Sequence, residues 1–161
     1  MELQEGRRRL IALFGDGLSP VLVPPWNRIP PKLLPSLPAL GLRALSTFGW
    51  AEVGPVAGLR EANCHIDIID WKATRRGHEH GKLVQDMTGA LTIARARSWA
   101  PVGILTHHLA HGDRAWSFLE DLFDCTSDQG TVRWIASDEV LCSARPLSRP
   151  REKVSARSDD G

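Results

Sequence analysis

Apolar and polar residues follow two different spacings along this chain, one typical of helices and the other typical of short strands. Where apolar residues recur three or four positions apart, they lie on one face of a helix. The spacing predicts helices over residues 3–14 and 82–97, and a third that starts at Asp113, whose side chain can cap it. Its apolar face is expected to be Ala115, Trp116, Leu119, Leu122 and Phe123. A helical turn after Pro30–Pro31 ending at Gly41, and a short helix over 137–143, complete the predicted helical segments.

Short apolar runs bounded by proline, glycine or polar residues predict strands between these helices. Residues 50–62 and 72–81 separate the runs and are expected to be loops. Strands that alternate with helices indicate an α/β fold with a parallel sheet, either open or closed like a barrel. The predicted strands lie within residues 20–26, 42–49, 63–71, 101–107 and 131–136.

Length and charge limit the classes of protein to which the chain can belong. With 161 residues it is long enough for one domain with a real core. The net charge is +1, from 20 basic and 19 acidic side chains, which gives no reason to expect nucleic acid or an anionic membrane as a partner. The three arginines at 7–9 are expected to form a solvated helix face. The last residues, 144–161, have little to bury and are expected to be disordered.

Cysteine usage and the distribution of apolar residues point to a cytoplasmic protein. Cys64, Cys125 and Cys142 are widely spaced and form no C-x-x-C pair, so free thiols in a reducing compartment are expected. No run approaches the roughly 20 apolar residues that span a bilayer. The first residues also lack the order of charge, apolar block and cleavage site that marks a signal peptide.

Three histidines stand close together at the end of an apolar run, in the sequence ILTHHLAHGD over residues 104–113. His107 and His111 are four residues apart, as in a zinc-protease helix, but position 108 holds histidine where such a helix needs glutamate. The preceding residues are β-prone, so His107 is expected to end a strand. The carboxyl ends of parallel strands are where α/β proteins build their sites. A loop histidine bonded to backbone carbonyls is the alternative.

Two aspartates follow another apolar strand, in HIDIIDW over residues 65–71. Strand alternation places Asp67 and Asp70 on opposite sides, so only one of them need face a site. A carboxylate bonded to an imidazole fixes its tautomer and suits general acid–base catalysis. Alternatively, an aspartate here caps the turn that follows.

A stiff turn, VPPWNR over residues 23–28, follows the first predicted strand. Trp26 can form an aromatic wall, and Asn27 and Arg28 can donate hydrogen bonds. Such a turn can direct backbone N–H groups at a developing oxyanion, unless it is purely structural. The sequence HEH at 78–80 has no third ligand nearby and is expected to be a solvated loop.

The order of three of these motifs, P-P-W, D-x-x-D-W and L-T-H, resembles the later motifs of the polysaccharide deacetylase (NodB-type) family. The resemblance implies a distorted (β/α) barrel that removes N- or O-acetyl groups from carbohydrate with a divalent metal such as zinc. It implies that His107 protonates the leaving group, with His108 as a rival, and that Asp67 or Asp70 orients it. Trp71 would form an aromatic wall of the site.

The remaining motif of the resemblance departs from the family pattern at one position. The backbone after Pro25 would help hold the oxyanion, and Trp26 would line the groove. Val23 stands where the family has arginine, so that function would be lost or pass to Arg28.

The first two family motifs, T-F-D-D and H-x-x-x-H, have no counterpart in the chain, and Asp16 is no substitute for them. We therefore expect residues 1–143 to form a partial barrel that lacks its N-terminal strands, a truncated or inactive form that binds no metal alone. A non-catalytic carbohydrate-binding or interaction module, with Trp26 and Trp71 stacking on sugar rings, is the alternative.

Overall fold

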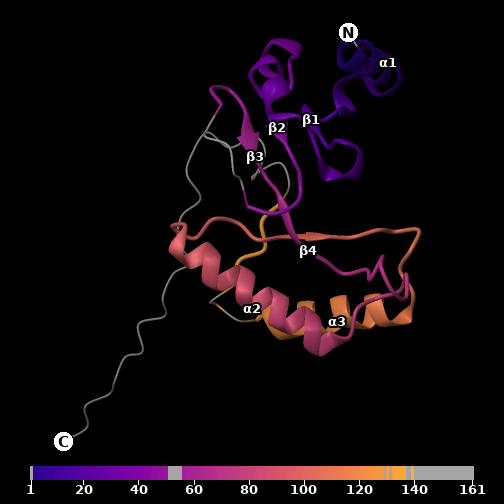
Figure 1. Cartoon of the computed structure of the whole chain (residues 1–161), viewed down its shortest axis with the longest axis vertical. Coiled ribbons are helices and arrows are strands. Elements are labelled where there is room, and N and C mark those ends of the chain that lie inside the picture. The colour runs from indigo at the N-terminus through magenta and orange to yellow at the C-terminus, as the bar shows by residue number, and fades with distance from the viewer. Residues whose placement is uncertain (1, 51–55, 129, 131, 137–138, 140–161) are drawn as a thin grey trace, which may run out of the picture. The chain divides into compact units, whose positions relative to one another are not determined.

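The computed structural model describes residues 2–50, 56–128, 130, 132–136 and 139 (Figure 1). These residues fall into two compact units. The first contains residues up to 65 together with 101–104 and 139, and the second contains 66–100 and 105–136. The division between the units falls within two paired strands, β4 (Cys64–Asp67) and β5 (Gly103–Leu105).

The first unit contains helix α1 (Glu2–Phe14) and a small parallel sheet. Strands β1 (Val21–Leu22), β2 (Ala44–Leu45) and β3 (Arg60–Glu61) lie in that order, with Ala44 opposite both Val21 and Arg60. The central strand, β2, is fully buried. These strands are only two residues long because a proline, a glycine or a polar residue stops each of them soon after it starts.

A proline- and leucine-rich segment between β1 and β2 supplies the core of this unit. It forms two short 3-10 helices, η3 (Pro31–Ser36) and η4 (Pro38–Leu40), and ends at Gly41 in a left-handed conformation. Proline favours such helical turns and glycine favours their left-handed end, so the predicted turn ending at Gly41 is confirmed. The buried residues of this core are Leu34, Leu37, Leu42 and Leu45.

The second unit pairs helices α2 (His80–Ala96) and α3 (Asp113–Ser127), which lie side by side in Figure 1. A Cβ on Gly77, just before α2, would lie only 2.8 Å from the backbone nitrogen of Ala115 in α3, so glycine permits this close approach. Polar contacts join the same helix ends, since Arg114 Nη1 lies 2.6 Å from Glu79 Oε1. The buried apolar residues are Ile66, Ile68, Ile69, Leu83, Ala90, Ala94, Ala115, Phe118 and Leu119.

All three long helices predicted from apolar spacing are confirmed, but the start and the buried face of α3 differ from expectation. Gly112 occupies the N-cap position and Asp113 is the first helical residue, so the predicted Asp113 cap is wrong. Trp116 is half exposed, and Phe118 is buried in the core instead. Trp116 and Phe118 are both large and aromatic, and the spacing of apolar residues alone did not decide which of the two packs into the core.

Two predictions about strands are also corrected. The expected loop at 50–62 contains strand β3. The expected strand at 131–136 is wrong, because residues 132–136 have no regular structure. Instead the Trp134 ring packs on Phe123 with centroids 4.6 Å apart, and its Nε1–H donates to Thr126 Oγ1 at 2.9 Å.

The architecture is α/β in the broad sense of helices with short parallel strands. Within the described residues the strands form one three-stranded and one two-stranded sheet, and no closed barrel. The predicted helix at 137–143, except for position 139, and the predicted disordered tail lie outside the described residues. No helix in the described part of the chain combines the length and the apolar character needed to cross a membrane.

Candidate functional site

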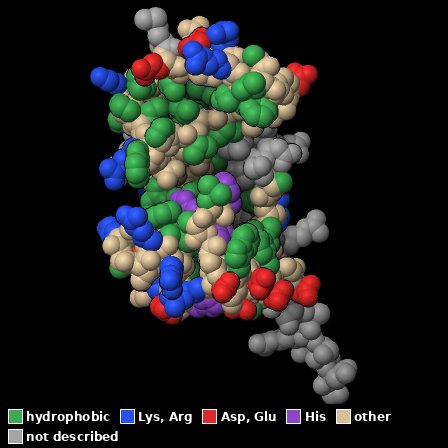
Figure 2. Space-filling model, turned by 90° about the vertical axis from the view of Figure 1, so that its right-hand side faces the viewer, with side chains coloured by type: hydrophobic (Ala, Val, Ile, Leu, Met, Phe, Trp, Pro, Cys, Tyr) green, Lys and Arg blue, Asp and Glu red, His purple; other side chains and the backbone are tan. Residues whose placement is uncertain are grey.

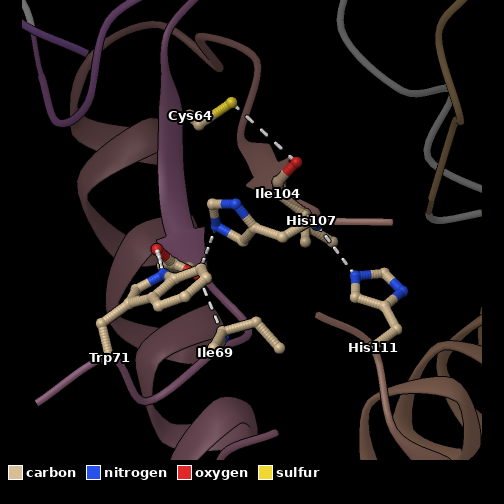
Figure 3. A network of polar contacts seen from close by, with 7 residues as sticks. Cys64, Ile69, Trp71, Ile104, His107 and His111 are labelled. Atoms are coloured by element: carbon tan, nitrogen blue, oxygen red, sulfur yellow. Dashed lines mark hydrogen bonds and ion pairs between the residues drawn. The ribbon is translucent and has the colours of Figure 1, made fainter. Parts of the chain in front are cut away.

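The carboxylate of Asp67, at the end of β4, is the centre of a polar network in the second unit (Figure 3). Its Oδ1 accepts the backbone N–H of Ile69 at 2.9 Å and lies 3.0 Å from Nε2 of His107. Its Oδ2 accepts the indole N–H of Trp71 at 3.1 Å. Three donors thus converge on one carboxylate, and an ionised carboxylate accepts hydrogen bonds and does not donate them. The Nε2 atom of His107 therefore carries the proton of this bond.

Buried isoleucines hold the two halves of this network in place. Ile68 and Ile69 follow Asp67 directly and are almost completely buried, so they anchor the end of β4 in the core. The N–H of Ile68 donates to the carbonyl of Leu105 at 3.4 Å, which keeps the end of β5 beside it. His107 follows Leu105 by two residues. The pairing of the two strand ends thus brings the imidazole to the carboxylate.

The indole of Trp71 lies against the imidazole as well as on the carboxylate. The two rings meet edge-on, with centroids 4.9 Å apart and an interplanar angle of 85°. This is a favoured geometry for aromatic pairs. Trp71 remains 46% exposed, whereas the side chains of Asp67 and His107 are 23% and 26% exposed. The network thus combines a half-buried carboxylate–imidazole pair with an accessible aromatic surface.

His111 holds the loop that carries His107. Its Nε2 accepts the backbone N–H of His107 at 2.9 Å (Figure 3). The N–H of Ala110 donates to the His107 carbonyl at 2.7 Å. The His111 ring contacts Trp116 edge-on at 4.7 Å. Burial lowers the pKa of His111, and the charges of His107 and His108 lower it further. A neutral imidazole is the form that can accept this bond.

The role of His111 was missed in the sequence, where its spacing from His107 was weighed only as that of a metal-binding pair. The signal that could have found it is its spacing of four residues from His107 across a tight turn, a separation that suits a side chain returning to the backbone of the loop.

The second aspartate of the motif caps the turn after the strand. Asp70 accepts backbone N–H groups from Lys72, Ala73 and Thr74 at 3.2, 3.0 and 3.3 Å. The bond from Ala73 is the largest cause of the lowered pKa of Asp70. Of the two predicted aspartates, Asp67 is therefore the one bonded to His107.

His108, the rival of His107, is exposed and shares no hydrogen bond with Asp67 in the described part of the chain. Histidine side chains reach the surface beside hydrophobic ones on the face drawn in Figure 2. His107, with its carboxylate and indole neighbours, is the histidine in an organised environment.

The predicted turn with Pro25 and Trp26 belongs to the first unit. Trp26 and Asn27 both have left-handed backbone angles, and Trp26 is 89% exposed. The N–H groups of Asn27 and Arg28 donate to the carbonyls of Pro24 and Pro25, at 3.0 and 3.3 Å. Those two groups are therefore engaged within the turn, while the Trp26 side chain is accessible.

The described residues do not fit a divalent metal site. No three His, Cys, Asp or Glu side chains among them are grouped to hold an ion. Both oxygens of Asp67 already accept hydrogen bonds. In the HEH segment, His80 Nδ1 lies 3.3 Å from Asp121 and its Nε2 3.3 Å from the Arg114 carbonyl, so this histidine joins two helices.

Comparison with known proteins places no further constraint on this site, because no protein-family model, no curated protein and no solved structure matches the chain.

Proposed function

We propose that the chain is a polysaccharide-deacetylase-like protein in which His107, oriented by Asp67, transfers a proton to the leaving group of an acetylated sugar. The observation that carries the proposal is the 3.0 Å contact between Nε2 of His107 and Oδ1 of Asp67. The order of the D-x-x-D-W and L-T-H motifs supports the same assignment.

In this proposal the two ring nitrogens of His107 have different tasks. Nε2–H donates to Asp67, so Nδ1 is the atom that would exchange a proton with the substrate. When the imidazole is doubly protonated, Nδ1–H gives its proton to the leaving oxygen or nitrogen as the C–O or C–N bond of the tetrahedral intermediate breaks. The electron pair of that bond stays with the leaving atom, and Asp67 stabilises the imidazolium before the transfer.

Trp71 supplies the surface against which a sugar would lie. Its exposed indole borders His107, and its N–H is fixed on Asp67, so the ring is oriented and not free to rotate. An oriented, half-exposed indole offers a rigid apolar face to the C–H groups of a pyranose.

The attack on the acetyl carbonyl needs an activated water in addition to a proton donor. Because the described residues include no group of three metal ligands, we expect acetate release to be slow and sugar binding to be the stronger signal.

The proposal is tested with the full chain and N-acetylglucosamine oligomers, by acetate release with and without zinc and by binding in calorimetry. His107→Gln is expected to lower acetate release at least tenfold while binding changes less than twofold. His108→Gln is the matched control and is expected to keep both. Acetate release that is unchanged in His107→Gln, or lost equally in His108→Gln, contradicts the proposal.

A second candidate is a non-catalytic carbohydrate-binding module, which the exposed indoles of Trp26 and Trp71 favour. In that case the oligomers bind, Trp71→Ala weakens binding at least tenfold, and no acetate appears under any condition. The two candidates therefore differ in acetate release and share the dependence on Trp71.

A further inference from the structure

Arg7 of helix α1 is a partly buried cation without an anionic partner among the residues that the structure describes. Its neighbours Arg8 and Arg9 both bond to Glu5, at 2.8 Å. No ion pair or hydrogen bond of the described residues involves the Arg7 guanidinium, and its Nε is buried without an acceptor. A charge that is partly removed from water and left unpaired is destabilising, so a protein gains by supplying an anion at such a place.

The guanidinium is seated on Gly41, the left-handed residue that ends the proline- and leucine-rich segment. A Cβ at position 41 would lie 3.0 Å from Nη2, 3.1 Å from Cζ and 3.3 Å from Nη1 of Arg7. Glycine therefore admits the flat head of Arg7 against the backbone, and any side chain here would have to displace it. This contact holds the guanidinium head against the backbone of Gly41.

Arg7 and Gly41 line an open cavity of about 500 Å³ at the surface of the first unit. Gln4 and Arg8 add polar groups to the lining, and Ile11 and Leu40 add apolar side chains. Ile11 is 40% exposed, so its apolar surface is available to a ligand. The cavity therefore combines a cationic group and an apolar wall, in a volume that suits a small organic molecule.

We infer that this cavity binds a small carboxylate with a short apolar tail. The carboxylate would accept hydrogen bonds from Nη1 and Nη2 of Arg7, whose fork matches two coplanar oxygens. The tail would lie against Ile11 and Leu40 and remove their apolar surface from water. This site shares no residue with the Asp67–His107 network and is independent of the function proposed for it.

The experiment uses the full ¹⁵N-labelled chain and hexanoate as the probe, with acetate and hexylammonium as comparisons. Hexanoate is expected to shift the Arg7 Nε–Hε resonance to saturation. Acetate, which lacks the tail, is expected to bind at least tenfold more weakly, and hexylammonium, which has the wrong charge, is expected not to bind. Failure of hexanoate to bind, or equal binding of hexylammonium, overturns the inference.

Variants locate the site. Arg7→Met and the milder Arg7→Lys, which keeps the charge but loses the fork, are each expected to weaken hexanoate at least tenfold. Gly41→Ala is expected to weaken it by displacing the guanidinium. Arg9→Met removes an exposed arginine that is paired with Glu5 and is expected to leave binding within twofold. If Arg7→Lys, folded by its amide spectrum, binds hexanoate as the unmodified chain does, the assignment to Arg7 is wrong.

Discussion

Nε2 of His107 lies 3.0 Å from Oδ1 of Asp67, although the two residues are 40 positions apart in the sequence. Asp67 is the last residue of β4, and His107 lies two residues after the end of β5 and not, as predicted, within the strand. The two strand ends pair through the bond from Ile68 to Leu105. Trp71 and Ile69 donate to the same carboxylate, so the chain after β4 folds back onto Asp67. The contact between Asp67 and His107 is thus supported by the pairing of the two strand ends and by the hydrogen bonds that Trp71 and Ile69 donate to the carboxylate.

Removing the carboxylate is expected to destabilise the chain. Asp67→Ala leaves the N–H groups of Ile69, Trp71 and His107 without their acceptor, and unsatisfied donors of this kind cost about 1–3 kcal/mol. We expect a loss of that size in the free energy of unfolding, measured by urea titration with circular dichroism.

A milder change isolates one bond of the network. Trp71→Phe keeps an aromatic ring near His107 and removes only the bond from Nε1 to Oδ2, for an expected loss of about 0.5–1.5 kcal/mol. The matched control is Trp26→Phe, at a position 89% exposed, where a change within about 0.5 kcal/mol is expected. Equal losses in the two variants would show that the Trp71 bond does not stabilise the fold.

Apolar periodicity was sufficient to predict the long helices and the strands that lead into the site. It was sufficient because Ile66 and Ile68 in one segment, and Leu83, Ala90 and Ala94 in another, repeat at the spacing of buried faces. The choice between Asp67 and Asp70 could not be predicted, because both are short acceptors next to a turn. Only the fold shows that the Asp70 carboxylate accepts the backbone N–H groups of Lys72, Ala73 and Thr74.

Other features depended on contacts that a local pattern does not encode. Residues 131–136 have the composition of a strand, but Trp134 is bonded to Thr126 of α3 instead of to a neighbouring strand. The seat of Arg7 on Gly41 joins positions 34 residues apart, so the arginine run at 7–9 resembled a uniform solvated face. A strand needs a partner and a cation needs an anion, and neither requirement is visible in a single segment.

His111 is expected to make stability fall in mild acid. Burial and the charges of His107 and His108 lower its pKa in the folded chain below the ordinary value of 6.5. As the pH falls through 6.5, the unfolded chain takes up a proton that the folded chain does not, so the free energy of unfolding decreases until the folded pKa is passed. Protonation would also remove the acceptor for the His107 N–H.

The measurement is the free energy of unfolding by urea at a series of pH values between neutral and 5. His111→Gln keeps an acceptor for the His107 N–H and does not titrate, so its pH dependence is expected to be flatter than that of the unmodified chain. His78→Gln is the control, since it removes an imidazole outside the 107–111 loop. The same slope in the unmodified chain and in His111→Gln would contradict the expectation.

Asp70 is expected to change the free energy of unfolding at a lower pH than His111 does, because its carboxylate loses its charge in stronger acid. Backbone bonds, led by that from Ala73, lower its pKa below the ordinary 3.8. Its contribution to stability is therefore complete above pH 3.8 and is lost as the pH falls through the lower, folded pKa. Asp70→Asn lacks the charge throughout, so we expect it to be less stable near neutral pH and to approach the unmodified chain near pH 2. Acid titration of the circular dichroism signal checks this, and a constant difference across the range would contradict it.

Gly103 in strand β5 and Gly89 in helix α2 give opposite expectations for the same substitution. A Cβ on Gly103 in β5 would lie 2.4 Å from the carbonyl oxygen of Asn63 and 3.0 Å from Cα of Cys64, and backbone atoms cannot move aside as a flexible side chain can. Gly103→Ala is therefore expected to lower the free energy of unfolding by about 1–3 kcal/mol. Around Gly89, within α2, nothing in the described residues beyond the nearby backbone of its own helix lies within 4 Å of an ideal Cβ. Gly89→Ala is therefore expected to raise the free energy of unfolding by about 0.5–1 kcal/mol through helix propensity. Urea unfolding of both variants compares the two effects. If Gly103→Ala is as stable as Gly89→Ala, the close approach of β5 to Asn63 does not exist in solution.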